Sequence, residues 1–205
     1  MEKKIPLFPS IVSDQLTGNE SINGNTTLLD YWRWAHSNLV DNTERGVFAE
    51  FLVHMAVGAT SKTRTNWDNY DILSPEGIRI EVKASGYIQS WAQEKLSAIS
   101  FSVRSTYGWD AETNQYLEEC ARQSDVYVFC LHKHVEQETI NILDVNQWTF
   151  FVLPTSVLNA KAGNQKTITL NGIRKLGAVE TDYEALHKTI CRLAGKELYG
   201  SLDGG

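Results

Sequence analysis

Hydrophobic residues recur at helical spacing in two stretches near the start of the chain. In residues 27–40 the spacing of three or four positions predicts a helix. A second helix is predicted from its cap at Asn42 or Thr43 to Gly58. Its main apolar stripe is Val47, Phe48, Phe51, Leu52 and Met55. Further apolar residues continue around this second helix, so we expect it to be buried.

The next stretch of the chain shows the alternating spacing of β-strands. Two short apolar runs, residues 70–74 and 78–83, flank Pro75-Glu76-Gly77, which predicts a β-hairpin. Side chains alternate in the second run, so its apolar residues share one face and its charged residues the other. The apolar residues are Ile78, Ile80 and Val82; the charged residues are Arg79, Glu81 and Lys83.

The remaining elements are less regular. Residues 125–131 are almost wholly apolar, which is typical of a central buried strand. Other strands are predicted at residues 98–103, 148–153 and 167–170, and a helix from Asp110 through Ala121. A capping box at residues 181–184 predicts a closing helix.

These elements predict an α/β protein in which helices flank a mixed central β-sheet. The length of 205 residues suits one domain. We expect an irregular arm at residues 1–25 and a single domain at residues 26–205. That domain would comprise a core at about 43–132 and an extension at 133–205.

Composition limits the expected cellular location and binding partners. No run is long enough to cross a bilayer, no secretory signal is recognisable, and the three cysteines are widely spaced. We therefore expect a cytoplasmic protein that does not bind membranes. A net charge of −6 counts against broad electrostatic binding of nucleic acid, although an acidic active site would contribute part of that charge.

Candidate chemistry lies at the end of the hairpin. Asp71, Glu81 and Lys83 bring two carboxylates and one ammonium group together there. Carboxylate oxygens suit a hard divalent cation, and such a cation activates water. The hairpin therefore indicates a metal-dependent phosphodiesterase acting on nucleic acid.

The order helix, three strands, helix, strand, with Asp71 followed by Glu81-x-Lys83, resembles the PD-(D/E)XK nuclease superfamily. This resemblance implies the restriction-endonuclease-like fold with its αβββαβ core. The segment from Gly46 to Glu50 is similar to the glycine-to-glutamate helix motif before the core of many members. Tyr70 stands where the name-giving motif has proline.

The resemblance also implies roles. Asp71 and Glu81 would be metal ligands, together with the Val82 carbonyl oxygen, and Glu50 would be a further or water-mediated ligand. Lys83 would orient the attacking water, and Gln89 would be an accessory group. The cofactor would be Mg²⁺, with Mn²⁺ as a substitute. The implied reaction is hydrolysis of DNA to a 5′-phosphate product, and two-fold cleavage of a duplex would call for a homodimer.

Two other functions compete with this one. A catalytically silent module on the same fold would bind DNA or a protein, which the acidic charge favours. A structural protein would carry the hairpin charges only on its surface. Metal binding that depends on Glu81 separates the enzyme from the structural protein.

Several further residues have two interpretations each. Glu44 competes with Glu50, but it lies in the first helical turn, where a carboxylate favours the helix dipole. His132 and His134 could be metal ligands, because alternate residues of a strand share a face. We prefer the interpretation that they form the polar end of a buried strand. Basic residues that could contact phosphate are Lys62 and Arg64 before the hairpin and Lys188, Arg192 and Lys196 on the closing helix. For the closing helix, a solvated face is preferred.

Overall fold

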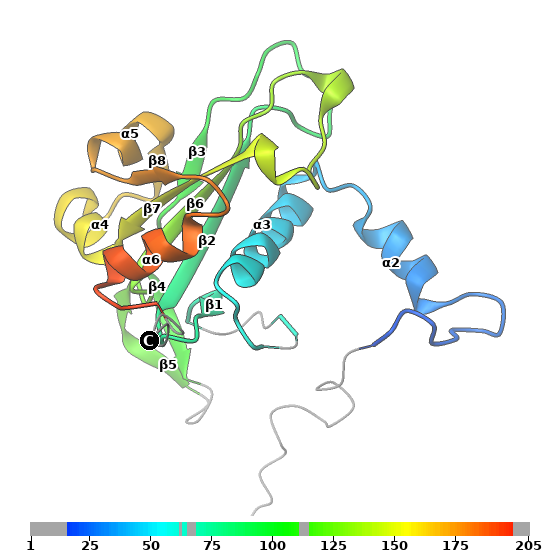
Figure 1. The fold of residues 1–205 in the computed structure, drawn as a ribbon, viewed down its shortest axis with the longest axis horizontal. Coiled ribbons are helices and arrows are strands. Elements are labelled where there is room, and N and C mark those ends of the chain that lie inside the picture. Colours follow the sequence, from blue (N-terminus) through cyan, green and yellow to red (C-terminus); the bar gives the residue numbers. More distant parts are fainter. Residues whose placement is uncertain (1–15, 62, 65–68, 111–114, 199–205) are drawn as a thin grey trace, which may run out of the picture.

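The computed structural model describes residues 16–61, 63–64, 69–110 and 115–198. Within these residues it contains five α-helices around β-sheets (Figure 1). The helices are α2 (Leu28–His36), α3 (Asn42–Ala56), α4 (Thr155–Ala162), α5 (Leu170–Lys175) and α6 (Leu186–Ala194). Two 3₁₀ turns, η1 (Gln137–Thr139) and η2 (Val145–Gln147), lie just before strand β7 (Trp148–Pro154).

The main sheet has five strands in the order β1-β2-β6-β7-β9. They are β1 (Ile72–Leu73), β2 (Arg79–Gly86), β6 (Val126–His132), β7 (Trp148–Pro154) and β9 (Val179–Thr181). Strands β2 and β6 are parallel, and the other neighbouring pairs are antiparallel. The prediction of a mixed α/β protein is therefore confirmed, and so is the β-hairpin, which is formed by β1 and β2.

Two small sheets accompany the main one. Strand β3 (Ser100–Ser102) pairs with β8 (Thr167–Thr169), and β4 (Thr106–Asp110) pairs with β5 (Gln115–Ala121). The strands predicted near residues 98–103 and 167–170 are thus confirmed. They lie outside the main sheet and pair with each other.

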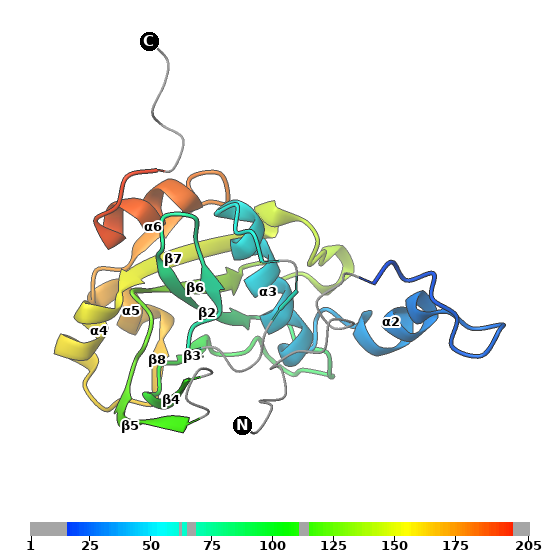
Figure 2. The same cartoon turned by 90° about the horizontal axis from the view of Figure 1, so that it is seen from below.

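Both faces of the main sheet are covered, because its central strands are apolar on both sides. Every residue of β6 is buried, as its sequence predicts. Helices α3 and α6 pack on one face, where Ile80, Val82 and Val128 lie. Helices α4 and α5 and the β3–β8 pair cover the other face, where Tyr127 and Phe129 lie. Figure 2 shows these two layers on either side of the sheet.

Helix α2 stands apart from the sheet (Figure 1). It begins after a capping box between Thr27 and Asp30 and has no buried residue. Trp34 is 84% exposed. The prediction of a helix here is confirmed, but it ends at His36 instead of Val40. The His36 Nδ1 atom lies 3.1 Å from Glu44 Oε2, which joins the end of α2 to the first turn of α3.

The apolar stripe predicted for α3 coincides only in part with its buried face, and the helix is less buried than expected. The helix buries Arg45, Ala49, Leu52 and Val53, whereas three residues of the predicted stripe are exposed: Val47, Phe51 and Met55. A helix that is apolar on most sides has no single preferred face in its sequence. The contact with β2 selected the side carrying Ala49. The cap is also Asp41, whose side chain accepts a hydrogen bond from the Thr43 N–H.

Two other local predictions are wrong. The helix predicted from Asp110 through Ala121 is a strand over residues 115–121, because this stretch pairs with β4; residues 111–114 lie outside the described part. The closing helix begins at Leu186, not at the capping box, since Thr181 belongs to β9. No helix in the described part of the chain is long and apolar enough to span a bilayer.

Candidate active site

Asp71 holds the start of the hairpin to β2 through both its backbone and its side chain. The Asp71 N–H donates to the Ile80 carbonyl oxygen at 3.0 Å. The Val82 N–H in turn donates to Asp71 Oδ2 at 2.7 Å. The Asp71 carboxylate therefore takes the place of a strand partner beside β2.

This placement leaves an edge of β2 lined with oxygen atoms. Strand β1 pairs with β2 only at Ile80 and Arg79, so it does not extend along the strand past Ile80. In an extended strand the N–H and C=O of one residue point to the same side. Because the Val82 N–H points toward Asp71, the Val82 carbonyl oxygen faces the same edge.

Glu81 and Lys83 project to the sheet face opposite α3, because Val82 between them packs on the α3 side. The Lys83 Nζ atom lies 2.5 Å from Glu81 Oε1 and 3.9 Å from Asp71 Oδ2. The three side chains are 22–27% exposed. The structure thus brings together the three residues on which the sequence prediction depends.

Burial and neighbouring charges shift the pKa values of Glu81 and Lys83. Burial raises the pKa of Glu81, and the nearby Asp71 and Glu50 carboxylates add to the rise, against the opposing effect of Lys83. Burial lowers the pKa of Lys83, but Glu81 and Asp71 outweigh it, so the net shift is upward. Lys83 is therefore a cation held among carboxylates.

Glu50 approaches the same group from α3. It acts electrostatically on both Glu81 and Lys83. Its own partner is Arg64, whose Nε and Nη2 atoms lie 2.5 and 2.9 Å from the two carboxylate oxygens. The hydrogen bond to Glu50 is the main reason that the pKa of Arg64 is raised. Arg64 thus lies against Glu50; Lys62, the other predicted phosphate contact, lies outside the described residues.

Gln89 lies beyond the far end of β2. Its side-chain amide donates to the Gly86 carbonyl oxygen at 2.8 Å. Gly86 is three residues past Lys83, roughly 10 Å along an extended strand. The contacts of Gln89 therefore hold the turn after β2, and no hydrogen bond among the described residues joins it to Asp71, Glu81 or Lys83.

Tyr127 is a neighbour of the site that sequence reasoning missed. The parallel register sets it directly opposite Glu81, and it is buried. Burial raises its pKa, and the Glu81 carboxylate adds to the rise. Tyr127 belongs to an almost wholly apolar strand, so only the pairing of β2 with β6 reveals its position beside Glu81.

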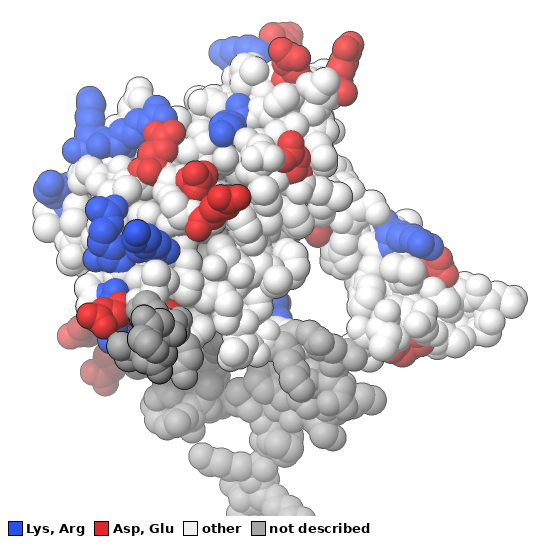
Figure 3. Space-filling view, in the orientation of Figure 1, with Lys and Arg blue, Asp and Glu red and all other residues white. Residues whose placement is uncertain are grey.

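The remaining candidate residues from the sequence lie outside this site. His132 is buried against Trp148 at 5.1 Å between ring centroids, and burial lowers its pKa to about 4. Lys188 and Arg192 are exposed on α6, and Lys196 is exposed just after its end. Figure 3 shows basic side chains gathered on the part of the surface that carries α5 and α6.

The donor set fits a hard cation. Asp71, Glu81 and the Val82 carbonyl supply oxygen atoms at one edge, and Mg²⁺ prefers oxygen ligands. Counting Glu50, the described residues place three carboxylates against the two cations Lys83 and Arg64, which leaves one excess negative charge when all five groups are ionised. This imbalance favours binding of a further cation.

A family model described as bacteriophage T4 endonuclease IV matches residues 28–172. The chain belongs to this family. The match includes every residue of the candidate site and ends before α6. The name of the endonuclease IV family supports nuclease activity for this chain. No curated protein matches the chain.

Proposed function

We propose that this member of the endonuclease IV family is a Mg²⁺-dependent endonuclease that hydrolyses phosphodiester bonds in DNA. Its active site would lie at the edge of β2, where Asp71 is beside Glu81 and Lys83. The observation that carries the proposal is the contact of one lysine ammonium with two carboxylates beside the part of β2 that β1 does not pair with. Family membership supports the same chemistry.

The fold proposed for this activity is the restriction-endonuclease-like one. Support comes from the mixed sheet, from α3 packed on β2, and from the hairpin, with Asp71 just before β1 and Glu81 on β2. Two features depart from the αβββαβ core: β3 lies outside the main sheet, paired with β8, and a strand pair takes the place of a helix. The connection from β3 to β6 contains the β4–β5 pair where the resemblance implies a helix.

Each residue has a distinct role in the proposed reaction. Asp71, Glu81 and the Val82 carbonyl would hold Mg²⁺, which supplies Lewis acidity and lowers the pKa of a bound water when present. Lys83 would position the attacking water and stabilise negative charge that develops on the phosphate. Glu50 would add negative potential and orient Arg64, whose guanidinium group is suited to a DNA phosphate.

The test is a cleavage panel of supercoiled, linear, single-stranded and branched DNA, with RNA of matched length. We expect products with Mg²⁺ or Mn²⁺, none with EDTA, and none from Glu81→Gln, which keeps the shape of the side chain but removes its charge. Nicked and linear products from supercoiled DNA distinguish single-strand from double-strand cutting. Retained cleavage by Glu81→Gln would exclude this site as the active site.

Absence of cleavage by the wild-type protein on every substrate would contradict the enzyme and favour a silent DNA- or protein-binding module. Circular dichroism and DNA binding, measured on the same preparations, separate that outcome from misfolding. If the acidic protein binds DNA without cutting it, the silent module is the better description.

A further inference from the structure

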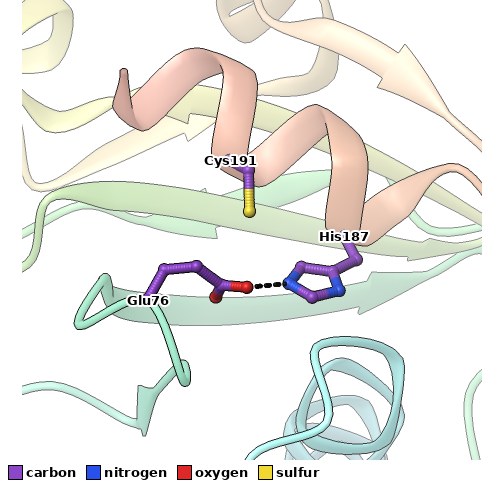
Figure 4. Close-up of side chains that lie close together, drawn as sticks. All are labelled: Glu76, His187 and Cys191. Atoms are coloured by element: carbon purple, nitrogen blue, oxygen red, sulfur yellow. Dashed lines mark hydrogen bonds and ion pairs between the residues drawn. The ribbon is translucent and has the colours of Figure 1, made fainter. Parts of the chain in front are cut away.

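A second group of potential ligands lies at the tip of the same hairpin. Glu76 is in the turn between β1 and β2, and His187 and Cys191 lie one turn apart on α6 (Figure 4). Among the described residues, only this set brings three His, Cys, Asp or Glu ligand atoms within 4.8 Å of one another. The three side chains point toward a common centre between the hairpin and the helix.

We propose that Glu76, His187 and Cys191 form a zinc-binding site. The proposal concerns residues outside the active site, and two of them lie outside the region matched by the family model. It therefore does not depend on the proposed nuclease function.

The chemistry of the three donors fits Zn²⁺. One carboxylate oxygen, one imidazole nitrogen and one thiolate sulfur are ordinary zinc ligands, whereas Mg²⁺ prefers oxygen alone. Bond lengths of about 2.0–2.3 Å in a tetrahedron place ligand atoms roughly 3.3–3.8 Å apart. The observed cluster, within 4.8 Å, needs only small side-chain movements to reach that spacing.

Positioning also favours a site over a chance contact. Residues four apart on a helix face the same side, so α6 presents His187 and Cys191 together. His187 Nε2 lies 3.0 Å from Glu76 Oε1, and the Glu76 side chain is only 4% exposed. The His187 side chain is 23% exposed, which leaves access for water as a fourth ligand.

The simpler interpretation is a buried Glu76–His187 pair beside a core cysteine. Without a cation, an ordinary cysteine thiol keeps its proton at neutral pH. Zinc binding would displace this proton, forming the Zn–S bond and releasing H⁺ to solvent. The two interpretations therefore predict different metal binding and different proton release.

A zinc ion here would link the hairpin tip to α6. The hairpin carries Asp71 and Glu81 at its other end, on the opposite face from α6. The site would consequently stabilise the hairpin while leaving the catalytic groups free to bind their own cation.

The first experiment titrates metal-free full-length protein with Zn²⁺ by calorimetry in buffers of different ionisation enthalpy, with Co²⁺ as a spectroscopic probe. We expect one equivalent of Zn²⁺, proton release, and a thiolate-to-cobalt charge-transfer band. Cys191→Ala and His187→Gln should each weaken binding by about 100-fold or more, with loss of the band in Cys191→Ala.

Matched controls locate the site. Cys120→Ala removes an exposed cysteine on β5 and should retain the cobalt band, as should Glu81→Gln in the proposed active site. The proposal is overturned if the wild type binds no stoichiometric Zn²⁺, or if folded Cys191→Ala keeps both the affinity and the band. Cleavage with Mg²⁺ alone, measured on the same variants, separates failure of the zinc site from failure of the nuclease.

Discussion

Lys83 lies in the middle of β2, and the Arg45 guanidinium lies against Gly86 at the end of that strand; the surroundings of these two cations differ sharply. Lys83 lies against the carboxylates of Glu81 and Asp71. Arg45 is almost fully buried, and its hydrogen bonds go to the carbonyl oxygens of Val40 and Ile88 and to the side-chain amide of Asn42.

The difference distinguishes a functional charge from a structural one. The Lys83 group has more negative than positive charge and stays partly exposed, so it can accept a further cation. Arg45 donates to neutral oxygens that need its N–H groups, and burial lowers its pKa against the opposing effect of Asp41. We therefore expect changes at Lys83 to affect activity and changes at Arg45 to affect stability.

The largest effect is expected from Lys83→Ala. Cleavage should fall by about 10³-fold or more, because the positioned cation beside the phosphate is lost. The thermal midpoint should move by only a few degrees. Lys95→Ala, at an exposed lysine after β2, is the control and should cleave normally. Comparable loss of cleavage in both variants would contradict a specific role for Lys83.

Arg45→Met should reverse this pattern. Loss of the buried guanidinium leaves the Val40 and Ile88 carbonyls unsatisfied, so the free energy of unfolding should decrease by roughly 2–4 kcal/mol. Cleavage per folded molecule should be unchanged. Arg33→Met, at an exposed arginine of α2, is the control for urea unfolding. A loss of cleavage without a loss of stability would assign Arg45 to the active site instead.

Gly86→Ala tests the close approach of Arg45 to β2. A Cβ atom at Gly86 would lie 2.7 Å from Arg45 Nη1, so we expect a loss of about 1–3 kcal/mol in the free energy of unfolding. In Arg45→Met the same substitution should cost less, because the clash is relieved. Gly46→Ala is the control: a Cβ there meets nothing within 4 Å, and alanine favours the helix. Additive losses at positions 86 and 45 would contradict the clash.

Glu50→Gln should have the smallest effect, about a 10-fold decrease in cleavage together with altered metal dependence. It also changes the pH profile. Cleavage requires ionised Glu81, whose pKa is raised partly by Glu50. Removing that charge lowers the Glu81 pKa, so the acid limb should move to lower pH. Glu44→Gln is the control, and an equal shift in that variant would assign the role to Glu44.

Sequence patterns determined the local parts of the site. The turn at Pro75 and Gly77, the alternation around Glu81 and Lys83, and the apolar run of β6 each depend on neighbouring residues, and the structure agrees with all three. Alternation fixes the face of each side chain once a segment is extended, so a charged face opposite an apolar one is readable without tertiary information.

Predictions failed where a distant partner decided the outcome. The stretch at residues 115–121 became a strand because β4 pairs with it, and the buried face of α3 was chosen by β2. Local propensity is weaker than such tertiary contacts.

The neighbours of each charge were also decided only by the tertiary structure. The sequence placed Asp71, Glu81 and Lys83 on one hairpin, but packing of α3 and the register of β6 brought Glu50 and Tyr127 beside them. Docking of α6 likewise set His187 and Cys191 against Glu76, 111 residues away from His187. Electrostatic interactions depend on distance through space, and only the folded chain determines that distance.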